Sequence, residues 1–192
     1  MFDQIIKSLA NYISLDKSEL EFFLNKLQIK QLKGKELLMG EGQICKNAYF
    51  INKGCFRIYN NIEGVEVTGQ FFFENDWYTD YASFLSQKPS LLNIETLEKT
   101  ELIILAKTDL VELFVEIPKF ERFGRLIAEN AFLGLQQRTD MYVNQSPEQR
   151  YLKLMNDRPN IFQRVPQHYI ASYLGIKPPS LSRIRKRIFE NN

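Results

Sequence analysis

The sequence predicts an α+β fold in three successive parts, and three observations indicate it. Short apolar runs punctuated by glycine occupy residues 31–110, where six of the nine glycines fall. A proline-free segment with helical periodicity follows over residues 119–143. Near the C-terminus, two short amphipathic segments flank a single glycine. We therefore expect a β-rich domain with N-terminal helices, a long helix and a small helical domain, over residues 1–116, 117–144 and 145–192.

The first part begins with helical spacing and then changes character. Apolar residues three and four apart predict short helices within residues 1–30, the second of them after a capping-box-like sequence from Ser18 to Glu21. The runs that we predict as strands are 48–51, 55–59, 65–73, 91–97 and 102–105. Many short strands separated by turn residues are typical of a sandwich or barrel. A short helix over residues 109–115 should end before Pro118.

The long segment carries apolar and small residues along one stripe. The stripe consists of Phe120, Phe123, Ile127, Ala131, Gly134 and Met141, and the first five are the candidate seam residues. Such a stripe can pack closely against a second helix. A helix of about 25 residues spans roughly 37 Å, which is longer than a small barrel can cover. We therefore favour a dimer seam between two copies of this helix. The alternative is that the stripe packs on the chain's own barrel.

The C-terminal part predicts a helix-turn-helix over residues 166–188. A preceding helix should start at Ser146, because Pro147 suits the first helical position and Gln149 completes a capping box. Within the motif, Gly175 can adopt the positive φ that ends the first helix. The residues expected to face inward are Ile170, Ala171 and Leu174 in the first helix and Leu181, Ile184 and Ile188 in the second.

The opposite face of the last helix offers cations and a hydroxyl. Arg183 is the candidate base reader, because an Arg side chain can donate two parallel hydrogen bonds to guanine in the major groove. The side chains expected at phosphates are Arg185, Lys186, Arg187 and Lys177, whereas Ser180 and Gln167 suit either purpose. The alternative for this basic run is an ordinary solvated charged face.

The distribution of charge favours the DNA-binding interpretation. Residues 145–192 contain nine Lys and Arg against three Asp and Glu, a net charge of +6. Residues 1–144 contain 16 against 20, a net charge of −4. A polyanion is therefore expected to bind at the C-terminal end, and double-stranded DNA is the predicted partner.

Other classes of function find little support in the composition. Two cysteines and one histidine are too few for the usual zinc or iron–sulfur ligand sets, so no metal is expected. The β-rich part contains no histidine for a metal-dependent barrel enzyme, and no catalytic constellation is evident, so we expect no enzymatic activity. No apolar run is long enough to span a membrane and no signal peptide is evident, which predicts a cytoplasmic protein.

The order of these parts resembles the Crp/Fnr family of bacterial transcription regulators over nearly the whole chain. The stretches that carry the resemblance are Gly40–Gly42, Ala48–Gly54, the long helix, Ile170–Ile176 and Ser180–Ile184. The resemblance implies an N-terminal double-stranded β-helix, or jelly roll, of the cyclic-nucleotide-binding type. It also implies a homodimer formed through the long helix, two-fold symmetric operators, and RNA polymerase as a further candidate partner.

The resemblance also locates an effector pocket. In nucleotide-binding members of the family, a Gly-Glu pair holds the ribose and an Arg-Ser pair holds the cyclic phosphate. The corresponding positions here are Thr79 and Asp80 for the first pair and Ser90 and Leu91 for the second. No Lys or Arg occurs in residues 89–98, and a buried phosphate without such a partner costs several kcal/mol.

We therefore expect no cofactor and no tight binding of cyclic AMP. An unidentified small-molecule effector stays open, because Trp77, Tyr78, Tyr81 and Phe84 would suit an apolar or ring-shaped molecule. The alternative is that these aromatic residues belong to the core. Two functions follow for the whole chain: a dimeric DNA-binding transcription regulator, or a cyclic-nucleotide or other small-molecule sensor module with weak or vestigial DNA binding.

Overall fold

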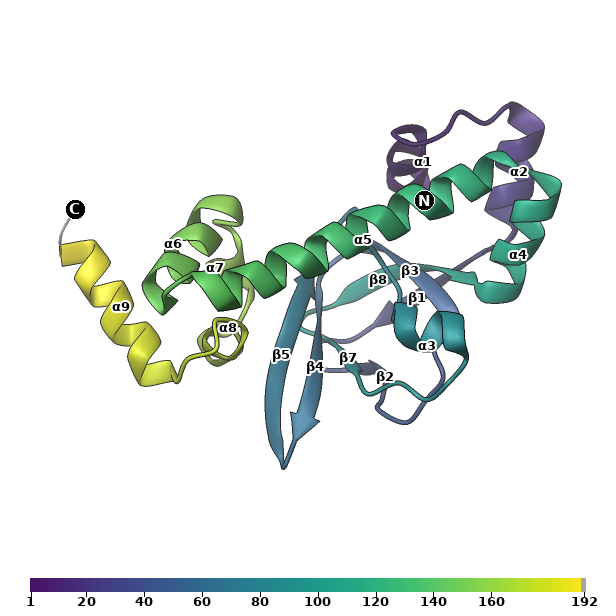
Figure 1. Ribbon diagram of the computed structural model, residues 1–192. Helices are drawn as coiled ribbons and strands as arrows, with labels where there is room; N and C mark the ends of the chain where they lie inside the picture. Colours follow the sequence, from purple (N-terminus) through teal and green to yellow (C-terminus); the bar gives the residue numbers. More distant parts are fainter. Residues whose placement is uncertain (191–192) are drawn as a thin grey trace. The chain divides into compact units, whose positions relative to one another are not determined.

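The computed structural model describes residues 1–190 and confirms the α+β class (Figure 1). Its strands form two four-stranded sheets, and its C-terminal third is helical. Contacts between residues divide the chain into two compact units. The roll unit comprises residues 1–58 and 71–131, and the C-terminal unit comprises residues 59–70 with the chain from residue 132 onward. The predicted division at residues 116 and 144 stays a prediction.

Two sheets form the framework of the roll. The first has the strand order β1 (Leu27–Leu32), β8 (Thr100–Ala106), β3 (Asn47–Lys53) and β6 (Trp77–Tyr78). The second has the order β2 (Leu37–Met39), β7 (Asn93–Thr96), β4 (Phe56–Ile62) and β5 (Val65–Phe72). β1 was not predicted, because its apolar residues continue the helical spacing of the segment before it. It forms by antiparallel pairing with β8, about 70 positions later in the sequence.

One core cluster fills the roll between these strands, and a second lies beneath its helices. The first cluster includes Tyr49, Ile51, Phe56 and Leu102. The second lies under α1 (Asp3–Ala10), α2 (Lys17–Asn25) and α4 (Lys107–Glu116). The capping box of α2 begins at Asp16 and not at Ser18, because the Asp16 carboxylate accepts from the Glu19 N–H at 2.9 Å.

The second cluster contains residues that we had assigned to a dimer seam. Phe120 is completely buried and Phe123 is 3% exposed. The Phe120 ring lies 5.2 Å from Phe23 in α2, and the Phe123 ring lies 5.2 Å from Trp77. Figure 1 shows α1 and α2 alongside the first half of α5 (Lys119–Asn144). The seam prediction is therefore wrong for Phe120 and Phe123, because both side chains pack inside their own chain.

Farther along α5, a different face of the helix is exposed to solvent in the protomer. Ile127 is half-buried against the same cluster, whereas Ala131 and Gly134 are exposed. Larger apolar side chains are also exposed beyond them, with Phe132 at 64% and Leu135 at 66%. The residues Ala128, Phe132, Leu135 and Thr139 follow the four-three spacing of a helix–helix seam. This exposed face lies roughly a third of a turn around the helix from the predicted stripe.

The C-terminal unit contains α6 (Pro147–Asp157), α7 (Ile161–Arg164), α8 (Gln167–Tyr173) and α9 (Pro178–Glu190). The predicted capping box of α6 is confirmed, because the Ser146 hydroxyl accepts from the Gln149 N–H at 3.3 Å and Pro147 begins the helix. None of the helices formed by residues 1–190 has the length and apolarity needed to cross a bilayer.

Candidate nucleic-acid interface and effector cassette

The turn between α8 and α9 has the geometry that the sequence predicted. Gly175 has φ of +67°, in the left-handed region that favours glycine. Its N–H donates to the Ser172 carbonyl at 3.0 Å, and the N–H of Ile176 donates to the Ala171 carbonyl at 3.0 Å. These bonds satisfy carbonyls that a helix leaves unpaired at its end. The two helices are thus joined by an ordered turn.

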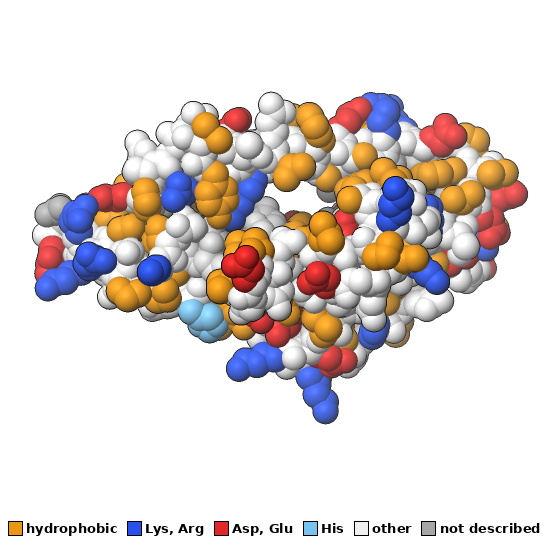
Figure 2. Space-filling model, turned by 60° about the horizontal axis from the view of Figure 1, so that its bottom comes forward, with side chains coloured by type: hydrophobic (Ala, Val, Ile, Leu, Met, Phe, Trp, Pro, Cys, Tyr) orange, Lys and Arg blue, Asp and Glu red, His pale blue; other side chains and the backbone are white. Residues whose placement is uncertain are grey.

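α9 packs on the rest of its unit through one aliphatic face. The side chains of Leu181, Ile184 and Ile188 are at most 8% exposed and belong to the core of the unit. Pro178 begins the helix, where a missing N–H costs nothing. The side chains of Arg183, Lys186 and Arg187 are exposed on the other side. Figure 2 shows Lys and Arg side chains around this end of the chain, with apolar side chains between them.

Arg183 is exposed and only weakly tethered. Its Nε lies 3.4 Å from the Pro179 carbonyl, and its Nη2 lies 3.4 Å from the Ser180 hydroxyl, both near the outer limit for hydrogen bonding. Such contacts are readily exchanged for a better acceptor. The Arg183 guanidinium is therefore accessible at the surface, whereas Ser180 is half-buried, and the role of Arg183 as a base reader stays a prediction.

The other predicted contact residues differ in availability. Arg187 pairs with Glu148 of α6 at 2.9 Å, and because its side chain is 62% exposed the pair can be exchanged for a phosphate at little cost. Lys186 lies 3.6 Å from Glu190 in a similarly exposed pair. Lys177 and Gln167 are exposed, and Arg185 is half-buried on the flank of α9. Their roles at DNA stay predictions.

The sequence analysis did not include Ser182, which lies on the exposed face of α9. Ser182 is exposed and lies one helical turn before Lys186. Its position could have been found from the angle around the helix, because 100° per residue places it opposite Ile184 and Ile188. Ser182 is therefore a better-exposed hydroxyl than Ser180.

We expect Gly175→Ala to destabilise the C-terminal unit by more than Gly64→Ala does. A Cβ at Gly175 would lie 2.8 Å from Cε1 of Tyr142, whereas a Cβ at Gly64 would meet nothing within 4 Å. Both residues have positive φ, so both substitutions cost about 1–2 kcal/mol of backbone strain. Urea unfolding of both variants isolates the cost of the clash. Equal losses of stability would contradict the close packing at Tyr142.

Residues 79–91 of the roll unit contain the four predicted pocket positions, and we call this segment the effector cassette. Asp80 forms hydrogen bonds to two other residues of the cassette. It is the N-cap of α3 (Tyr81–Ser86), and its Oδ1 accepts from the Ser83 N–H at 3.4 Å. Its Oδ2 accepts from the Ser90 hydroxyl at 2.6 Å. Asp80 is 6% exposed and Ser90 is 2% exposed. A carboxylate thus occupies the interior of the cassette with its hydrogen bonds supplied by the cassette itself.

Of the other predicted pocket residues, Thr79 is buried and Leu91 is exposed. Thr79 is 9% exposed and donates to the Asn47 carbonyl at 3.0 Å, beside Asp80 in the chain. Leu91 is 71% exposed and so lies outside this buried group. Ser83 was missed, although its spacing from Asp80 is that of an N-cap and its partner. Its hydroxyl donates to the Lys88 carbonyl at 2.6 Å.

The aromatic residues near the cassette belong mainly to the core. The Tyr78 ring lies 4.5 Å from Phe72, and Phe84 packs in the same cluster. Burial raises the pKa of Tyr78 well above its usual value, and the nearby charge of Asp80 adds to the increase. Trp77 packs against Phe50 at 5.2 Å. The core interpretation of Trp77, Tyr78 and Phe84 is therefore confirmed.

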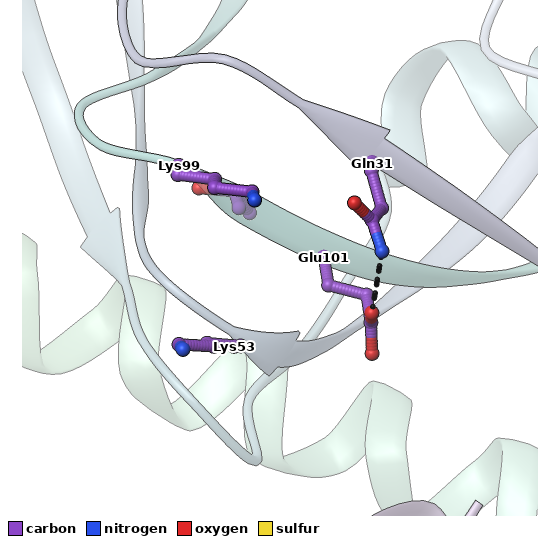
Figure 3. A pocket seen from close by; sticks show the side chains of 5 residues that line it. Gln31, Lys53, Lys99 and Glu101 are labelled. Carbon is purple, nitrogen blue, oxygen red and sulfur yellow. Dashed lines mark hydrogen bonds between the residues drawn. The ribbon is translucent and has the colours of Figure 1, made fainter. Parts of the chain in front are cut away.

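A surface hollow of about 160 Å³ lies elsewhere on the roll unit, lined by Gln31, Lys53, Lys99, Thr100 and Glu101. Figure 3 shows Gln31 and Glu101 pointing toward one another, and their side chains are joined by a hydrogen bond of 3.1 Å. None of the predicted effector residues lines it. Ligand pockets are usually about 300–1,000 Å³, so the hollow is small for a nucleotide. Within residues 1–190, no group of three His, Cys, Asp or Glu side chains could hold a metal ion.

Comparisons with known proteins show what the roll is similar to. Residues 29–116 match the family model of the cyclic nucleotide-binding domain. This range extends from β1 to the end of α4 and contains Asp80 and Ser90. The roll therefore has the fold of cyclic nucleotide-binding domains, and in this chain a pair of helices joined by a tight turn follows it.

Solved structures extend the likeness to nearly the whole chain. The c-di-GMP-responsive global regulator CLP of Xanthomonas campestris is 15% identical, with 92% of this chain and 93% of CLP covered and a TM-score of 0.73. FixK2 of Bradyrhizobium japonicum is 15% identical, with coverages of 86% and 85% and a TM-score of 0.74. A chain of Eubacterium rectale assigned to the Crp/Fnr family is 15% identical, with coverages of 92% and 85% and a TM-score of 0.71. The chain therefore has the fold of Crp/Fnr transcription regulators, as its sequence predicted, although no curated protein sequence matches it.

Proposed function

We propose that this protein is a DNA-binding transcription regulator that acts as a homodimer. The observation that carries the proposal is the division of α9 into a buried aliphatic face and an exposed basic face that includes Arg183. A helix of this kind fits the major groove, where base edges can be read by Arg. The shared fold of known regulators supports the same conclusion and favours a regulatory over a catalytic role.

The exposed apolar face of α5 supports the dimer. Phe132 and Leu135 are each more than half exposed in the protomer, and their spacing with Ala128 and Thr139 suits a parallel helix pair. Burying these side chains removes apolar area from water, at roughly 25 cal/mol per Å². A two-fold axis between the two α5 helices would present two copies of α9 to successive major grooves, about 34–36 Å apart.

Selection of bound DNA from a random pool, followed by titration at several salt concentrations, tests the proposal. We expect enrichment of a two-fold symmetric sequence. The logarithm of the binding constant should fall linearly with the logarithm of salt concentration, because Lys and Arg displace counterions from phosphates. Binding that is unsaturable, or equally strong for every sequence, would favour the second candidate function, a sensor module with vestigial DNA binding.

We further propose that the cassette does not bind cyclic AMP tightly. The resemblance places the cyclic phosphate near Ser90, whose hydroxyl already donates to the Asp80 carboxylate. A second anion there would meet a like charge, and two unit charges about 4 Å apart interact by about 4 kcal/mol at an effective dielectric constant of 20. The absence of Lys and Arg from residues 89–98 adds the loss of a counter-charge.

Calorimetry with cyclic AMP and cyclic GMP checks this second proposal. We expect no saturable heat below about 1 mM of either nucleotide, a limit that corresponds to about −4.1 kcal/mol of binding free energy. The same protein sample should bind the selected operator, which controls for its folding. Micromolar binding of either nucleotide would overturn the argument from Asp80.

A further inference from the structure

The C-terminal end of α8 is gripped by side chains from two other helices. Nη2 of Arg138 donates to the Tyr173 carbonyl at 2.6 Å, and the Tyr142 hydroxyl donates to the same oxygen at 2.5 Å. Nε of Arg150 donates to the Leu174 carbonyl at 3.0 Å. The last carbonyls of a helix have no donors within the helix itself. In this unit α5 and α6 supply those donors, and we call Arg138, Tyr142 and Arg150 the clamp.

The clamp is stabilised by backbone dipoles and aromatic rings. The Arg138 guanidinium lies 3.5 Å from the centroid of the Tyr173 ring and 4.4 Å from that of Tyr142. Burial lowers the pKa of Arg138, and the charge of Arg150 acts in the same direction, whereas Tyr173 and Tyr142 raise it. A cation at a helix C-terminus is favoured by the helix dipole, and a ring face adds to that attraction. In the observed orientation of α8, Nη2 of Arg138 and Nε of Arg150 both have a carbonyl acceptor at the end of that helix.

Arg150 extends the clamp to the junction between α5 and α6. It is 8% exposed, and its Nη1 donates to the Gln145 carbonyl at 2.8 Å, just before α6 begins. One guanidinium thus binds both the end of α8 and the α5–α6 connection. Rotation of α8 relative to α5 would move the Tyr173 and Leu174 carbonyls away from Arg138 and Arg150 and leave these donors without their acceptors.

The position of α9 follows from the clamp. Gly175 directly follows Leu174, and its backbone packs so closely on the Tyr142 ring that only glycine fits there. α9 begins three residues later, at Pro178. The turn therefore has little freedom to redirect α9 while the clamp is closed. None of the three clamp residues lies on the exposed face of α9 that is proposed to contact DNA.

We propose that the clamp formed by Arg138, Tyr142 and Arg150 is a specificity-determining device that fixes α9 relative to α5, so that a dimer accepts operators of a single half-site spacing. The inference rests on the proposed function. It assigns a role to residues that do not touch DNA: Arg138 is a positioning residue, and its contribution is geometric. Phosphate contacts, and hence the dependence of affinity on salt, should be independent of it.

The test measures affinity against operator spacing for the full-length protein. The selected operator is lengthened or shortened by one and two base pairs between its half-sites, and binding is followed by fluorescence anisotropy. Each base pair shifts one half-site by about 3.4 Å along the helix axis. For the wild-type protein we expect one optimal spacing, with at least tenfold weaker binding two base pairs away.

Arg138→Met should flatten this profile to within about threefold and weaken binding at the optimum by about tenfold, with the salt slope unchanged. Arg122→Met, which removes an exposed arginine from the same helix, is the matched control and should keep the wild-type profile. Tyr142→Phe removes the two hydrogen bonds of the hydroxyl, one donated to the Tyr173 carbonyl and one accepted from Arg138, but keeps the ring, and should broaden the profile to a smaller extent. It serves as the second variant if Arg138→Met fails to fold by circular dichroism.

The outcomes separate this inference from the proposed function. If the wild-type protein fails to bind any selected DNA, the proposed function is wrong. If the wild-type protein binds with one optimal spacing and the folded clamp variants keep that optimum, the inference is overturned while the function stands. A wild-type profile that is already flat also overturns it.

Discussion

Replacing Arg183 by alanine is expected to weaken binding to the selected operator by at least about 30-fold. A bidentate pair between Arg and guanine contributes about 1–3 kcal/mol of discrimination, and a symmetric dimer would lose two such pairs. The guanidinium is exposed and held only by 3.4 Å contacts, so it is free to make that pair. Fluorescence anisotropy should be recorded with the operator and with versions substituted at each position. Discrimination should relax at one guanine in each half-site and persist elsewhere.

Two further substitutions separate base reading from general electrostatics. Lys186→Ala should weaken binding to all sequences alike and reduce the salt slope by about one per protomer, because a phosphate contact carries no sequence information. Lys153→Ala removes the same charge from α6, where the side chain is 51% exposed and paired with Asp157. It should change affinity by less than about threefold. Unchanged operator affinity in Arg183→Ala would show that another side chain reads the bases.

Phe120→Ala is expected to cost about 3–5 kcal/mol of stability in the roll unit. The Phe120 side chain is completely buried and lies 5.9 Å from Phe123 and 5.2 Å from Phe23, ring centre to ring centre. Removing a buried phenyl ring loses its transfer free energy and leaves a cavity that the surrounding helices fill only partly. Urea unfolding followed by tryptophan fluorescence measures the loss, because Trp77 packs on Phe123 in the same cluster.

Leu135→Ala is the matched substitution on the exposed part of the same helix. Leu135 is 66% exposed, so the stability of the protomer should change by less than about 0.5 kcal/mol. Sedimentation equilibrium should nevertheless show a weaker dimer, because the variant loses apolar area from the proposed seam. Unfolding is best compared at low protein concentration, where dimerisation contributes little to apparent stability. A Phe120→Ala protein that is fully stable but monomeric would contradict this prediction. It would show that Phe120 lies in the dimer seam, as the sequence first predicted.

The local patterns of the sequence predicted much of the candidate interface. Turn geometry at Gly175, the start of α9 at the proline pair and the inward face of Leu181, Ile184 and Ile188 all follow from spacing within about 20 residues. Such features depend on φ preferences and on helical periodicity, both of which are local. The effector pocket was predicted only by resemblance; of its four positions Thr79, Asp80 and Ser90 are buried and Leu91 is exposed, and their role at an effector stays a prediction.

The sequence by itself therefore determined which segments are helices and strands in most of the chain, where the helix-turn-helix lies, and that positive charge concentrates at the C-terminal end. Only the tertiary structure decided which apolar stripe of α5 is buried, because Phe120 and the exposed Leu135 are equally apolar in sequence. The same holds for β1, whose partner strand lies about 70 residues away, and for the clamp, whose donors and acceptors are 24–35 positions apart. Periodicity reports which side chains share a face, whereas packing against distant segments decides which face meets water.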